Sequence, residues 1–392
     1  MQKLNIGLFG FGVVGEGIYK VLENKPQLNA KIKKVVIKDS NKERNAPSEL
    51  FSTDPNDILE DDDINVVVEL ISDSNAAYSI ITKAFKKGKH VVSANKKLIA
   101  EHHEELLKLQ NENNVSFLYE ASVCGSVPII RNLEEYFDND LLNYVFGIVN
   151  GTTNYILTKM SNENQSYEEA LKEAQNNGFA EADPTADVEG FDAAHKLSII
   201  TLHAFGVKIE TDEIIRRGIT SLHQNDLKYA KEKGYTVKLI ANSQIIHETG
   251  GINSTVLPTF VNLDKTIGLV NNEYNGVLIG SSLSDEQFLY GKGAGRFPTS
   301  SAVLSDISAL QYDYKYSIRK KSDKKVNFNQ SGEVRVYLGF KSKELELEKY
   351  FEEVEEVFQS KDYNYIIGNI SINNLKKEEI LNNSELSVIV FE

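Results

Sequence analysis

A glycine-rich turn near the N-terminus narrows the choice of fold more than any other segment. It comprises Gly10, Phe11, Gly12, Val13, Val14 and Gly15, and it joins an apolar run at Leu4–Gly10 to a helical pattern at Gly15–Leu22. A G-x-G-x-x-G run between a strand and a helix is typical of a dinucleotide-binding βαβ unit. Its first glycine permits the tight turn, its second lets a pyrophosphate approach the backbone, and its third allows close helix–strand packing. This context favours nucleotide binding over a chance glycine turn.

The same rhythm continues to about residue 130. Buried-strand patterns recur at Lys33–Lys38, Val66–Ile71 and His90–Ala94, and an amphipathic helix is predicted over Ala76–Lys87. Alternating strands and helices build a parallel sheet with helices on both faces. The sequence therefore predicts an α/β fold, with a Rossmann-type doubly wound sheet and an NAD(P)-binding domain at residues 1–130.

The end of the second predicted strand bears on the choice of cofactor. An acidic residue there accepts hydrogen bonds from the ribose of NAD, whereas nearby cations favour the phosphate of NADP. Asp39 fits the first pattern, and Lys38 and Lys42 fit the second. The sequence leaves NAD and NADP both open.

A second domain is predicted at residues 131–316, where strands at Val145–Val149, Lys238–Ala241 and Gly276–Ile279 are mixed with long helices. This mixture indicates an α+β domain. The chain can return to the first domain near residues 290–316. The charged and polar stretch Ser317–Ser331 is predicted as a linker.

The last part of the chain suggests a small separate α+β domain at residues 332–392. The predicted elements are a strand at Val334–Phe340, a helix at Leu345–Phe358, and strands at Tyr363–Ile372 and Leu386–Phe391.

Composition argues against several classes of partner. The chain has 43 Lys and Arg against 57 Asp and Glu, a formal net charge of −14, which argues against nucleic acid or an anionic membrane surface. No apolar window is long enough to span a bilayer, and the N-terminus enters a strand pattern without a cleavable signal. The single cysteine, Cys124, fits a reducing compartment. We expect a cytoplasmic protein without a nucleic-acid or membrane partner.

The segment 178–196 concentrates chemistry. Five carboxylates precede one lysine: Glu181, Asp183, Asp187, Glu189, Asp192 and then Lys196. A helix is predicted from Phe191 to Phe205, ending at Gly206, with Asp192, Lys196 and His203 along the edge of its apolar stripe. This arrangement suits a site that handles an amino acid and a proton. An i,i+4 Asp–Lys pair is also common on solvated helices, so this segment alone leaves both interpretations open.

Four further motifs each have a structural alternative. Lys96 follows a buried strand, where ligands of α/β sheets bind, but it can be plain surface charge. Glu120 and the small-residue loop after it could hold a hard cation or form a simple turn. Gly151 and Thr152 suit a small ligand, although Thr152 or Thr153 could cap a helix instead. A second glycine-rich loop, with Gly293 and Gly295, could approach a cofactor or only connect elements.

Together these motifs resemble the homoserine dehydrogenase family. The ordered set is GFGVVGEG, HVVSANKK, YEASVCGSVPII, VNGTTNYIL, GFAEADPTADVEGFDAAHKL and YGKGAGRFPTSSAV, spanning about residues 4–310. The resemblance implies NAD(P)-dependent interconversion of L-homoserine and L-aspartate 4-semialdehyde, in the pathway to threonine and methionine. It also implies a Rossmann domain, a substrate and dimerisation domain, a C-terminal ACT-like domain, and a homodimer or higher homo-oligomer.

The resemblance also implies roles for individual residues. Lys196 matches the catalytic lysine, and Lys96 matches a lysine that contacts the cofactor near the reacting carbon. The substrate-binding set is Glu181, Asp187, Asp192, Gly151 and Thr152. The cofactor-binding set is Gly10, Phe11, Gly12, Val13, Val14, Gly15, Asp39, Lys96, Gly293 and Gly295. Glu120, with the backbone carbonyls of Val123, Gly125 and Val127, matches a site for a monovalent cation such as Na⁺.

Two other functions compete with this one. The first is a related dehydrogenase acting on another small amino or hydroxy acid. The second is a non-catalytic sensor of nucleotide and amino acid, suggested by the loop Ser72–Ala76, which differs from the family pattern, and by the divergent tail.

Overall fold

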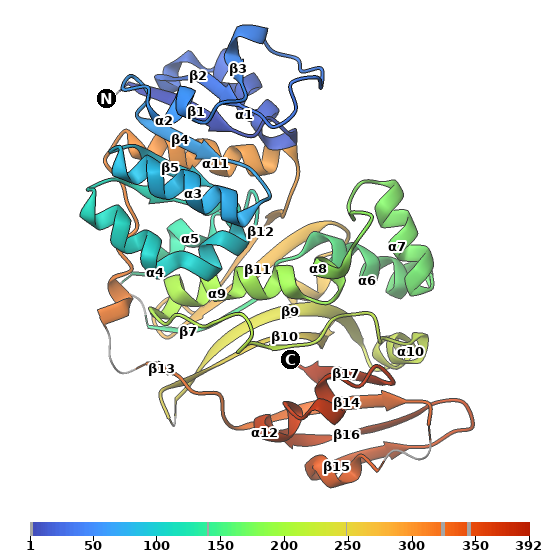
Figure 1. Ribbon diagram of the computed structural model, residues 1–392. Coiled ribbons are helices and arrows are strands. Elements are labelled where there is room, and N and C mark those ends of the chain that lie inside the picture. The colour runs from blue at the N-terminus through green and yellow to red at the C-terminus, as the bar shows by residue number, and fades with distance from the viewer. Residues whose placement is uncertain (1–2, 139–140, 248, 323–325, 343–345) are drawn as a thin grey trace. The chain divides into compact units, whose positions relative to one another are not determined.

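The chain forms two compact units in the computed structural model, which describes residues 3–138, 141–247, 249–322, 326–342 and 346–392. The first unit combines Met1–Tyr136 with Lys292–Ile318, and the second combines Phe137–Gly291 with Arg319–Glu392. The chain therefore leaves the first unit and returns to it once, for residues 292–318 (Figure 1).

The first unit is built on a six-stranded parallel sheet of order β3-β2-β1-β4-β5-β6. Its strands are β1 (Leu4–Phe9), β2 (Ala30–Val36), β3 (Phe51–Ser52), β4 (Val66–Glu69), β5 (His90–Ser93) and β6 (Phe117–Leu118). The order reverses at β1, and this confirms the predicted doubly wound sheet. The carboxyl ends of β1 and β4 meet at this point, where open α/β sheets bind ligands.

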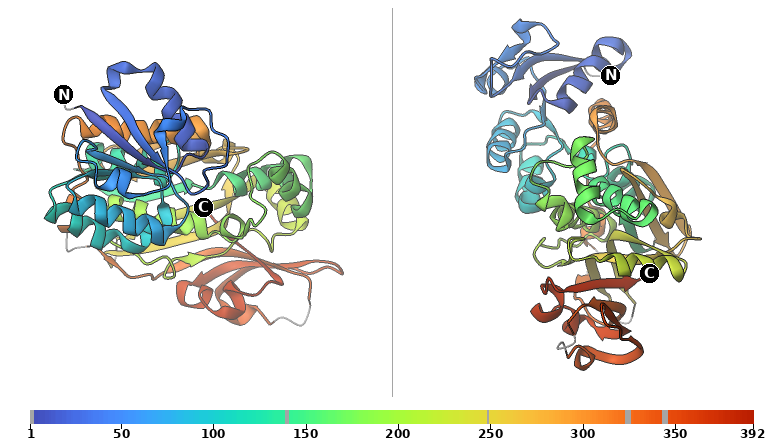
Figure 2. Two further views of the ribbon diagram at one scale, coloured as in Figure 1. Left: turned by 45° about the horizontal axis from the view of Figure 1, so that its top comes forward. Right: turned by 90° about the vertical axis from the view of Figure 1, so that its right-hand side faces the viewer.

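Helices cover this sheet (Figure 2). They are α1 (Val13–Asn24), α2 (Asn56–Leu59), α3 (Ser74–Lys86), α4 (Lys96–Glu112), α5 (Ile129–Arg131) and the later α11 (Arg296–Leu310). Helix α11 packs closely on α1. The absence of a side chain at Gly17 permits this approach, since a Cβ there would lie 2.4 Å from the Ser300 hydroxyl oxygen. The Ser300 hydroxyl donates a hydrogen bond to the Val14 carbonyl oxygen at 3.0 Å. The returning segment thus supports the glycine-rich turn.

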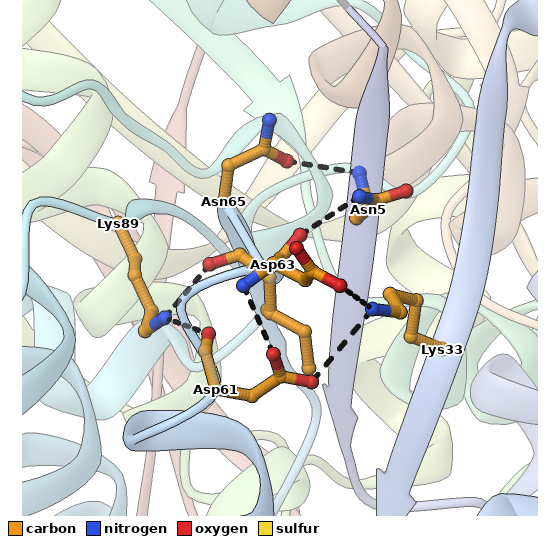
Figure 3. A network of polar contacts seen from close by, with 7 residues as sticks. Asn5, Lys33, Asp61, Asp63, Asn65 and Lys89 are labelled. Carbon is orange, nitrogen blue, oxygen red and sulfur yellow. Dashed lines mark hydrogen bonds and ion pairs between the residues drawn. The ribbon is translucent and has the colours of Figure 1, made fainter.

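A polar network fixes the opposite, amino-terminal edge of the same sheet (Figure 3). The buried Lys89 ammonium donates to the carbonyl oxygens of Asp61 and Ile64, at 2.6 and 2.7 Å. Lys33 pairs with the Asp63 carboxylate at 2.8 Å. These contacts hold the turn that leads into β4, and they lie at the edge away from the glycine-rich turn.

The second unit contains a mixed sheet of order β12-β11-β7-β9-β10-β17-β14-β16-β15, with β8 and β13 also paired to β10. Its first strands are β7 (Leu142–Ile148), β8 (Ile215–Arg216), β9 (Tyr235–Ile246), β10 (Gly251–Asn262), β11 (Tyr274–Ser281) and β12 (Glu286–Lys292). The C-terminal strands are β13 (Asn327–Phe328), β14 (Glu333–Phe340), β15 (Phe351–Phe358), β16 (Asn364–Ser371) and β17 (Leu386–Phe391). Strands β14 to β17 therefore continue this sheet through the β10–β17 pairing.

The helices of the second unit include α6 (Gly151–Glu163), α7 (Tyr167–Asn176), α8 (Thr185–Val188), α9 (Phe191–Phe205), α10 (Gln224–Glu232), α12 (Ile372–Leu375) and α13 (Glu378–Leu381). The predicted bounds of α9 are confirmed, and Gly206 ends it in the left-handed region at φ +72°. The prediction that polar side chains mark the edge of its buried stripe is wrong. Asp192, Lys196 and His203 are all buried, since α9 packs on β7, β9 and β10 and is covered almost all round.

The predicted helix at Leu345–Phe358 is wrong where the structure describes it. Residues Phe351–Phe358 form β15, an edge strand paired only to β16 in the described chain. The sequence FEEVEEVF spaces its apolar residues like a helix, but two register shifts in the β15–β16 pairing change the alternation expected of a strand. Its glutamates lie along a sheet edge, where charge discourages pairing with other chains. Leu345 itself lies outside the described residues.

The chain passes from the first unit to the second within the predicted linker Ser317–Ser331, and the described part of this stretch makes several contacts. Ile318 is buried, and Asn327–Phe328 pairs with β10. The Gln330 side-chain amide donates to the carbonyl oxygens of Glu213 and Ser254, at 3.1 and 3.2 Å. Of its apolar residues Ile318 is buried, whereas Val326 and Phe328 are half-buried. Residues 323–325 lie outside the described chain.

Candidate functional site

An ion pair at the start of α9 forms the centre of the site in the second unit. Gly190, with φ +79°, precedes the helix, and Asp192 and Lys196 follow one turn apart. The Lys196 ammonium lies 2.7 Å from the Asp192 carboxylate, and it donates to the Val149 carbonyl oxygen, also at 2.7 Å. Both side chains are at most 10% exposed. An ion pair so well shielded interacts more strongly than the solvated pair that the sequence also allowed.

Asn150 joins this pair to a second carboxylate. Its side-chain amide donates to Asp187 at 2.7 Å and to Asp192 at 2.8 Å. Its oxygen accepts the Thr153 backbone N–H at 2.9 Å, so Asn150 is the N-cap of α6. The alternative in which Thr152 or Thr153 caps this helix is wrong, because Asn150, which follows β7, occupies the N-cap position. Sequence reasoning missed Asn150 as a site residue, although a strand-end asparagine before Gly-Thr-Thr was a usable signal.

The predicted residues at the start of α6 lie beside this cluster. The Thr152 hydroxyl donates to the Phe179 carbonyl oxygen at 2.7 Å, which ties α6 to the loop before α8. A Cβ at Gly151 would lie 2.7 Å from the Glu273 carbonyl oxygen, so only glycine fits there without a shift. These contacts support the backbone around Asn150.

The cluster brings two carboxylates close enough to repel each other. Burial and the neighbouring Asp192 raise the pKa of Asp187, whereas the hydrogen bond from Asn150 lowers it. Two carboxylates bridged by one amide can bind a substrate ammonium, and this ammonium would relieve their mutual repulsion. Lys196 neutralises only one of the two.

Glu181 is not brought into this group by the contacts of the described residues. It is exposed on the loop before α8, and its carbonyl oxygen accepts a hydrogen bond from Gln175 at 3.1 Å. His203 is buried two turns further along α9. The structure therefore joins Asp187, Asp192, Lys196 and Thr152 and leaves Glu181 at the rim.

In the first unit, the glycine-rich turn has the geometry expected of a pyrophosphate site. Gly10 has φ +94°, and a Cβ there would lie 2.9 Å from the Leu70 carbonyl oxygen. A Cβ at Gly15 would lie 2.6 Å from the Gly10 carbonyl oxygen, whereas a Cβ at Gly12 would meet nothing within 4 Å. Gly12 is thus open to a ligand, and it stands as N-cap of α1, where backbone N–H groups favour anions.

A pocket of about 230 Å³ lies at this turn. It is lined by Gly12, Val13, Val14, Gly15, Leu70, Ile71, Ser72 and Ala94. Val13 is 57% exposed, so its side chain is accessible where it lines this pocket. Phe11 instead packs its ring against Phe51 and Tyr19.

Lys96 begins α4 directly after β5, with Asn95 as N-cap. Its place at the carboxyl end of a strand is the one predicted.

The Asp39 carboxylate turns into its own loop, where it accepts the Asn41 backbone N–H at 2.9 Å. Arg44 donates to the Asp39 carbonyl oxygen at 2.7 Å and lies over the Phe51 ring. Sequence reasoning missed Arg44, which follows the strand by several residues.

The second glycine-rich loop packs against the loop after β6. A Cβ at Gly125 would lie 2.5 Å from the Gly293 carbonyl oxygen, and Ser126 N–H donates to the Lys292 carbonyl oxygen at 3.0 Å. Gly295, with φ +120°, is the N-cap of α11. The two loops therefore support each other, and neither is a free connector.

Glu120 is buried within the first unit. Its two carboxylate oxygens accept the backbone N–H groups of Ile130 and Arg131, at 2.9 and 2.8 Å, and burial raises its pKa to about 7. Val123 and Val127 are buried beside it, and Gly125 has φ +54°. In the described chain, no group of three or more His, Cys, Asp or Glu residues could hold a metal ion. No described helix is long and apolar enough to cross a bilayer.

Comparison with known proteins gives one consistent family. The model for "Homoserine dehydrogenase, NAD binding domain" matches residues 10–120, and the model for "Homoserine dehydrogenase" matches residues 128–308. The homoserine dehydrogenase of Bacillus subtilis (strain 168) is 38% identical over 81% of this chain and 75% of its own length.

Solved structures agree over nearly the whole chain. A homoserine dehydrogenase from Thiobacillus denitrificans superposes with a TM-score of 0.87 at 30% identity, covering 99% of this chain and 98% of the other. A hyperthermophilic archaeal homoserine dehydrogenase in complex with NADPH has a TM-score of 0.69 at 26% identity, covering 80% and 99%. With the glycine-rich turn, the strand-end lysine and the buried Asp–Lys pair, these similarities show that the chain belongs to the homoserine dehydrogenase family of NAD(P)-dependent oxidoreductases.

Proposed function

We propose that this protein interconverts L-homoserine and L-aspartate 4-semialdehyde, with Lys196 as the group that moves the hydroxyl proton. The observation that carries the proposal is the buried chain of contacts Asp187–Asn150–Asp192–Lys196. Asp187 and Asp192 bind the substrate ammonium, and Lys196, after losing a proton to solvent, takes the hydroxyl proton as the neutral amine while hydride leaves the carbon. In the reducing direction, the Lys196 ammonium stabilises the developing alkoxide and protonates it.

The nicotinamide dinucleotide, when bound, accepts or supplies the hydride. The open Gly12 and the helix start behind it fit its pyrophosphate. Lys96, together with Gly293 and Gly295, is proposed to contact it from neighbouring loops.

Among the two nicotinamide cofactors, we propose NADP(H). A pocket of about 480 Å³ lies at the carboxyl end of β2, and Ser40, Lys42 and Arg44 are among the residues that line it. Because the Asp39 carboxylate is engaged in its own loop, the charge facing this pocket is positive. Arg44→Leu should raise the KM for NADPH by about 10-fold, the loss of one charged contact, and leave the KM for NADH unchanged. Equal changes for both cofactors would contradict this preference.

We also propose that a monovalent cation, rather than a divalent one, binds near Glu120. One carboxylate and backbone carbonyls are suitable ligands for a hard cation of low charge. The Val127 carbonyl oxygen already accepts the Ile129 N–H at 2.9 Å, so only its second lone pair is available to the cation. Exchange of Na⁺ for tetramethylammonium should lower activity, whereas a divalent-metal chelator should leave it unchanged.

A homodimer is proposed on the basis of the resemblance, and the exposed Leu283 and Tyr290 at the β12 edge of the sheet support it. Light scattering would show the assembly. A cytoplasmic location remains a prediction.

The proposed activity is tested by initial rates with NADP⁺ and a panel of L-homoserine, L-serine, L-malate and L-lactate. We expect turnover of homoserine alone. Turnover of another acid but not homoserine would support the related-dehydrogenase alternative, and binding of NADPH and homoserine without turnover would support the sensor.

A further inference from the structure

A buried glutamate stands at the end of β4 and is not explained by the reaction described above. Glu69 is fully buried. One of its carboxylate oxygens accepts the Ile71 backbone N–H at 2.7 Å, and the other accepts the Ser93 hydroxyl at 2.6 Å. Glu69 therefore joins the loop after β4 to the end of β5.

The network continues from Ser93 into the start of α4. The Ser93 oxygen accepts the Asn95 backbone N–H at 3.1 Å. The Asn95 side chain donates to the Ile71 carbonyl oxygen at 3.2 Å, and its own oxygen accepts the Leu98 N–H at 3.1 Å. The hydrogen bonds thus form a closed ring from Glu69 through Ser93 and Asn95 to Ile71, and this ring includes the cap of the helix that Lys96 begins.

This ring borders the nucleotide pocket. Leu70, Ile71 and Ala94 line that pocket together with the glycine-rich turn. A Cβ at Gly10 would already lie 2.9 Å from the Leu70 carbonyl oxygen, so the two loops have almost no clearance. A small displacement of residues 70–71 would therefore change the shape of the pocket.

Stability alone is a poor reason to keep a carboxylate in this position. Burial raises the pKa of Glu69 to about 7, a sign that the ionised form is costly there. Apolar residues of similar volume are often at least as stabilising as a buried charge. Local rules are commonly broken where function requires it.

We propose that Glu69 is a positioning residue for the cofactor: through Ile71, Ser93 and Asn95 it fixes the pocket wall opposite the glycine-rich turn and the helix start that carries Lys96. The proposal rests on the proposed function, because it assigns the pocket to NADP(H). It predicts that the network sets cofactor affinity without affecting affinity for the amino-acid substrate.

Two variants in the full-length protein test this. Glu69→Gln keeps the shape but turns an amide N–H₂ toward one of the two donors, and Ser93→Ala keeps the charge but removes the link to Asn95. We expect Glu69→Gln to raise the Kd and KM for NADPH by about 10-fold and Ser93→Ala by about 3- to 10-fold. The KM for aspartate semialdehyde should change less than about two-fold. The double variant should raise the Kd for NADPH by less than the product of the two single increases, because both residues belong to one network.

The matched control is Lys89→Met, which removes another buried charged group at the opposite edge of the same sheet (Figure 3). It should lower the melting temperature and leave the Kd for NADPH unchanged. The proposal is overturned if Glu69→Gln and Ser93→Ala shift the NADPH Kd no more than Lys89→Met does. If Glu69→Gln does not fold, the Ser93→Ala result decides.

Fluorescence titration of NADPH separates this proposal from the proposed reaction. If the wild-type protein does not turn over homoserine but Glu69→Gln weakens NADPH binding, the reaction is wrong and the positioning role stands. If homoserine is turned over and the titrations of wild type and both variants coincide, the reaction stands and the positioning role is wrong.

Discussion

At the residue scale, Asn150 links the charged side chains of the proposed substrate site. Its amide bridges Asp187 and Asp192, so both carboxylates keep fixed positions although their charges repel. Without the amide, the two acids would be expected to rotate apart or to share a proton. The carboxylate pair would then bind a substrate ammonium less well.

Asn150→Ala should therefore raise the KM for homoserine by about 10- to 100-fold, the value of about one hydrogen bond to a charged group. The KM for NADP⁺ should stay unchanged. Asn154→Ala is the control, since Asn154 is equally buried on the same helix but donates to the carbonyl oxygens of Val270, Asn272 and Tyr274. That control should lower stability alone. A homoserine KM that moves equally in both variants would refute the role of Asn150.

At the scale of elements, β9 carries a buried lysine beneath α6. Lys238 is 1% exposed, and its ammonium donates to the Val270 carbonyl oxygen at 2.5 Å and to the Asn154 and Asn271 side-chain oxygens at 3.2 Å. Burial lowers the pKa of Lys238 from 10.5 to about 7. The lysine thus ties helix, strand and loop together with neutral acceptors.

This shift makes stability depend on pH. Between about 7 and 10.5 the unfolded chain holds a proton that the folded protein has lost, so the free energy of unfolding rises with pH in that window. Between pH 7 and pH 9, the free energy of unfolding of the wild type should rise, relative to that of Lys238→Met, by up to about 1.4 kcal/mol per pH unit. Urea unfolding at both pH values measures the difference. Substitution of the exposed Lys231 by Met should leave the pH dependence of the unfolding free energy as in the wild type. If the wild type and Lys238→Met differ in stability by the same amount at both pH values, the pKa shift is disproved.

The elements also show how far the sequence could be interpreted. Strands β1, β2, β4 and β5 of the first unit and the bounds of α9 were predicted, because buried strands and capped helices leave strong local patterns, whereas the two-residue strands β3 and β6 were not. Strand β15 was not predicted, because its register shifts depend on its pairing with β16 and leave no pattern within the segment itself. The same limit applies to the site. Asp192 and Lys196 share one helix and were found. Asn150 has a local signal, its place after a strand and before Gly-Thr-Thr, but its bridge between Asp187 and Asp192 forms only when separate segments meet, as do the contacts of Glu69.

At the scale of the whole molecule, a short segment joins the C-terminal region to helix α8, part of the proposed substrate site. Arg217 is buried and donates to the carbonyl oxygens of Ile380, Leu381, Asn383 and Leu386. The residues that follow contact the end of α8: Ile219 N–H donates to the Val188 carbonyl oxygen, and the Thr220 hydroxyl donates to Glu189. Residues 215–221 therefore connect the C-terminal strands to helix α8, which carries Asp187.

Arg217→Met should destabilise the second unit by about 3 kcal/mol, because it leaves several buried carbonyl oxygens without their donor. Chemical unfolding followed by circular dichroism measures this. Arg335→Met, at an exposed pair with Glu355, is the comparison and should cost less than about 1 kcal/mol. Equal costs would mean that the C-terminal region is not anchored through Arg217.

The catalytic role of the buried ammonium is tested most directly by one substitution. Lys196→Met keeps the length and apolar character of the side chain and removes the proton-carrying group. It should lower kcat for homoserine oxidation by about 10²–10⁴-fold while the Kd for NADPH and the circular dichroism spectrum stay unchanged. A folded Lys196→Met enzyme that turns over homoserine at the wild-type rate would contradict the account.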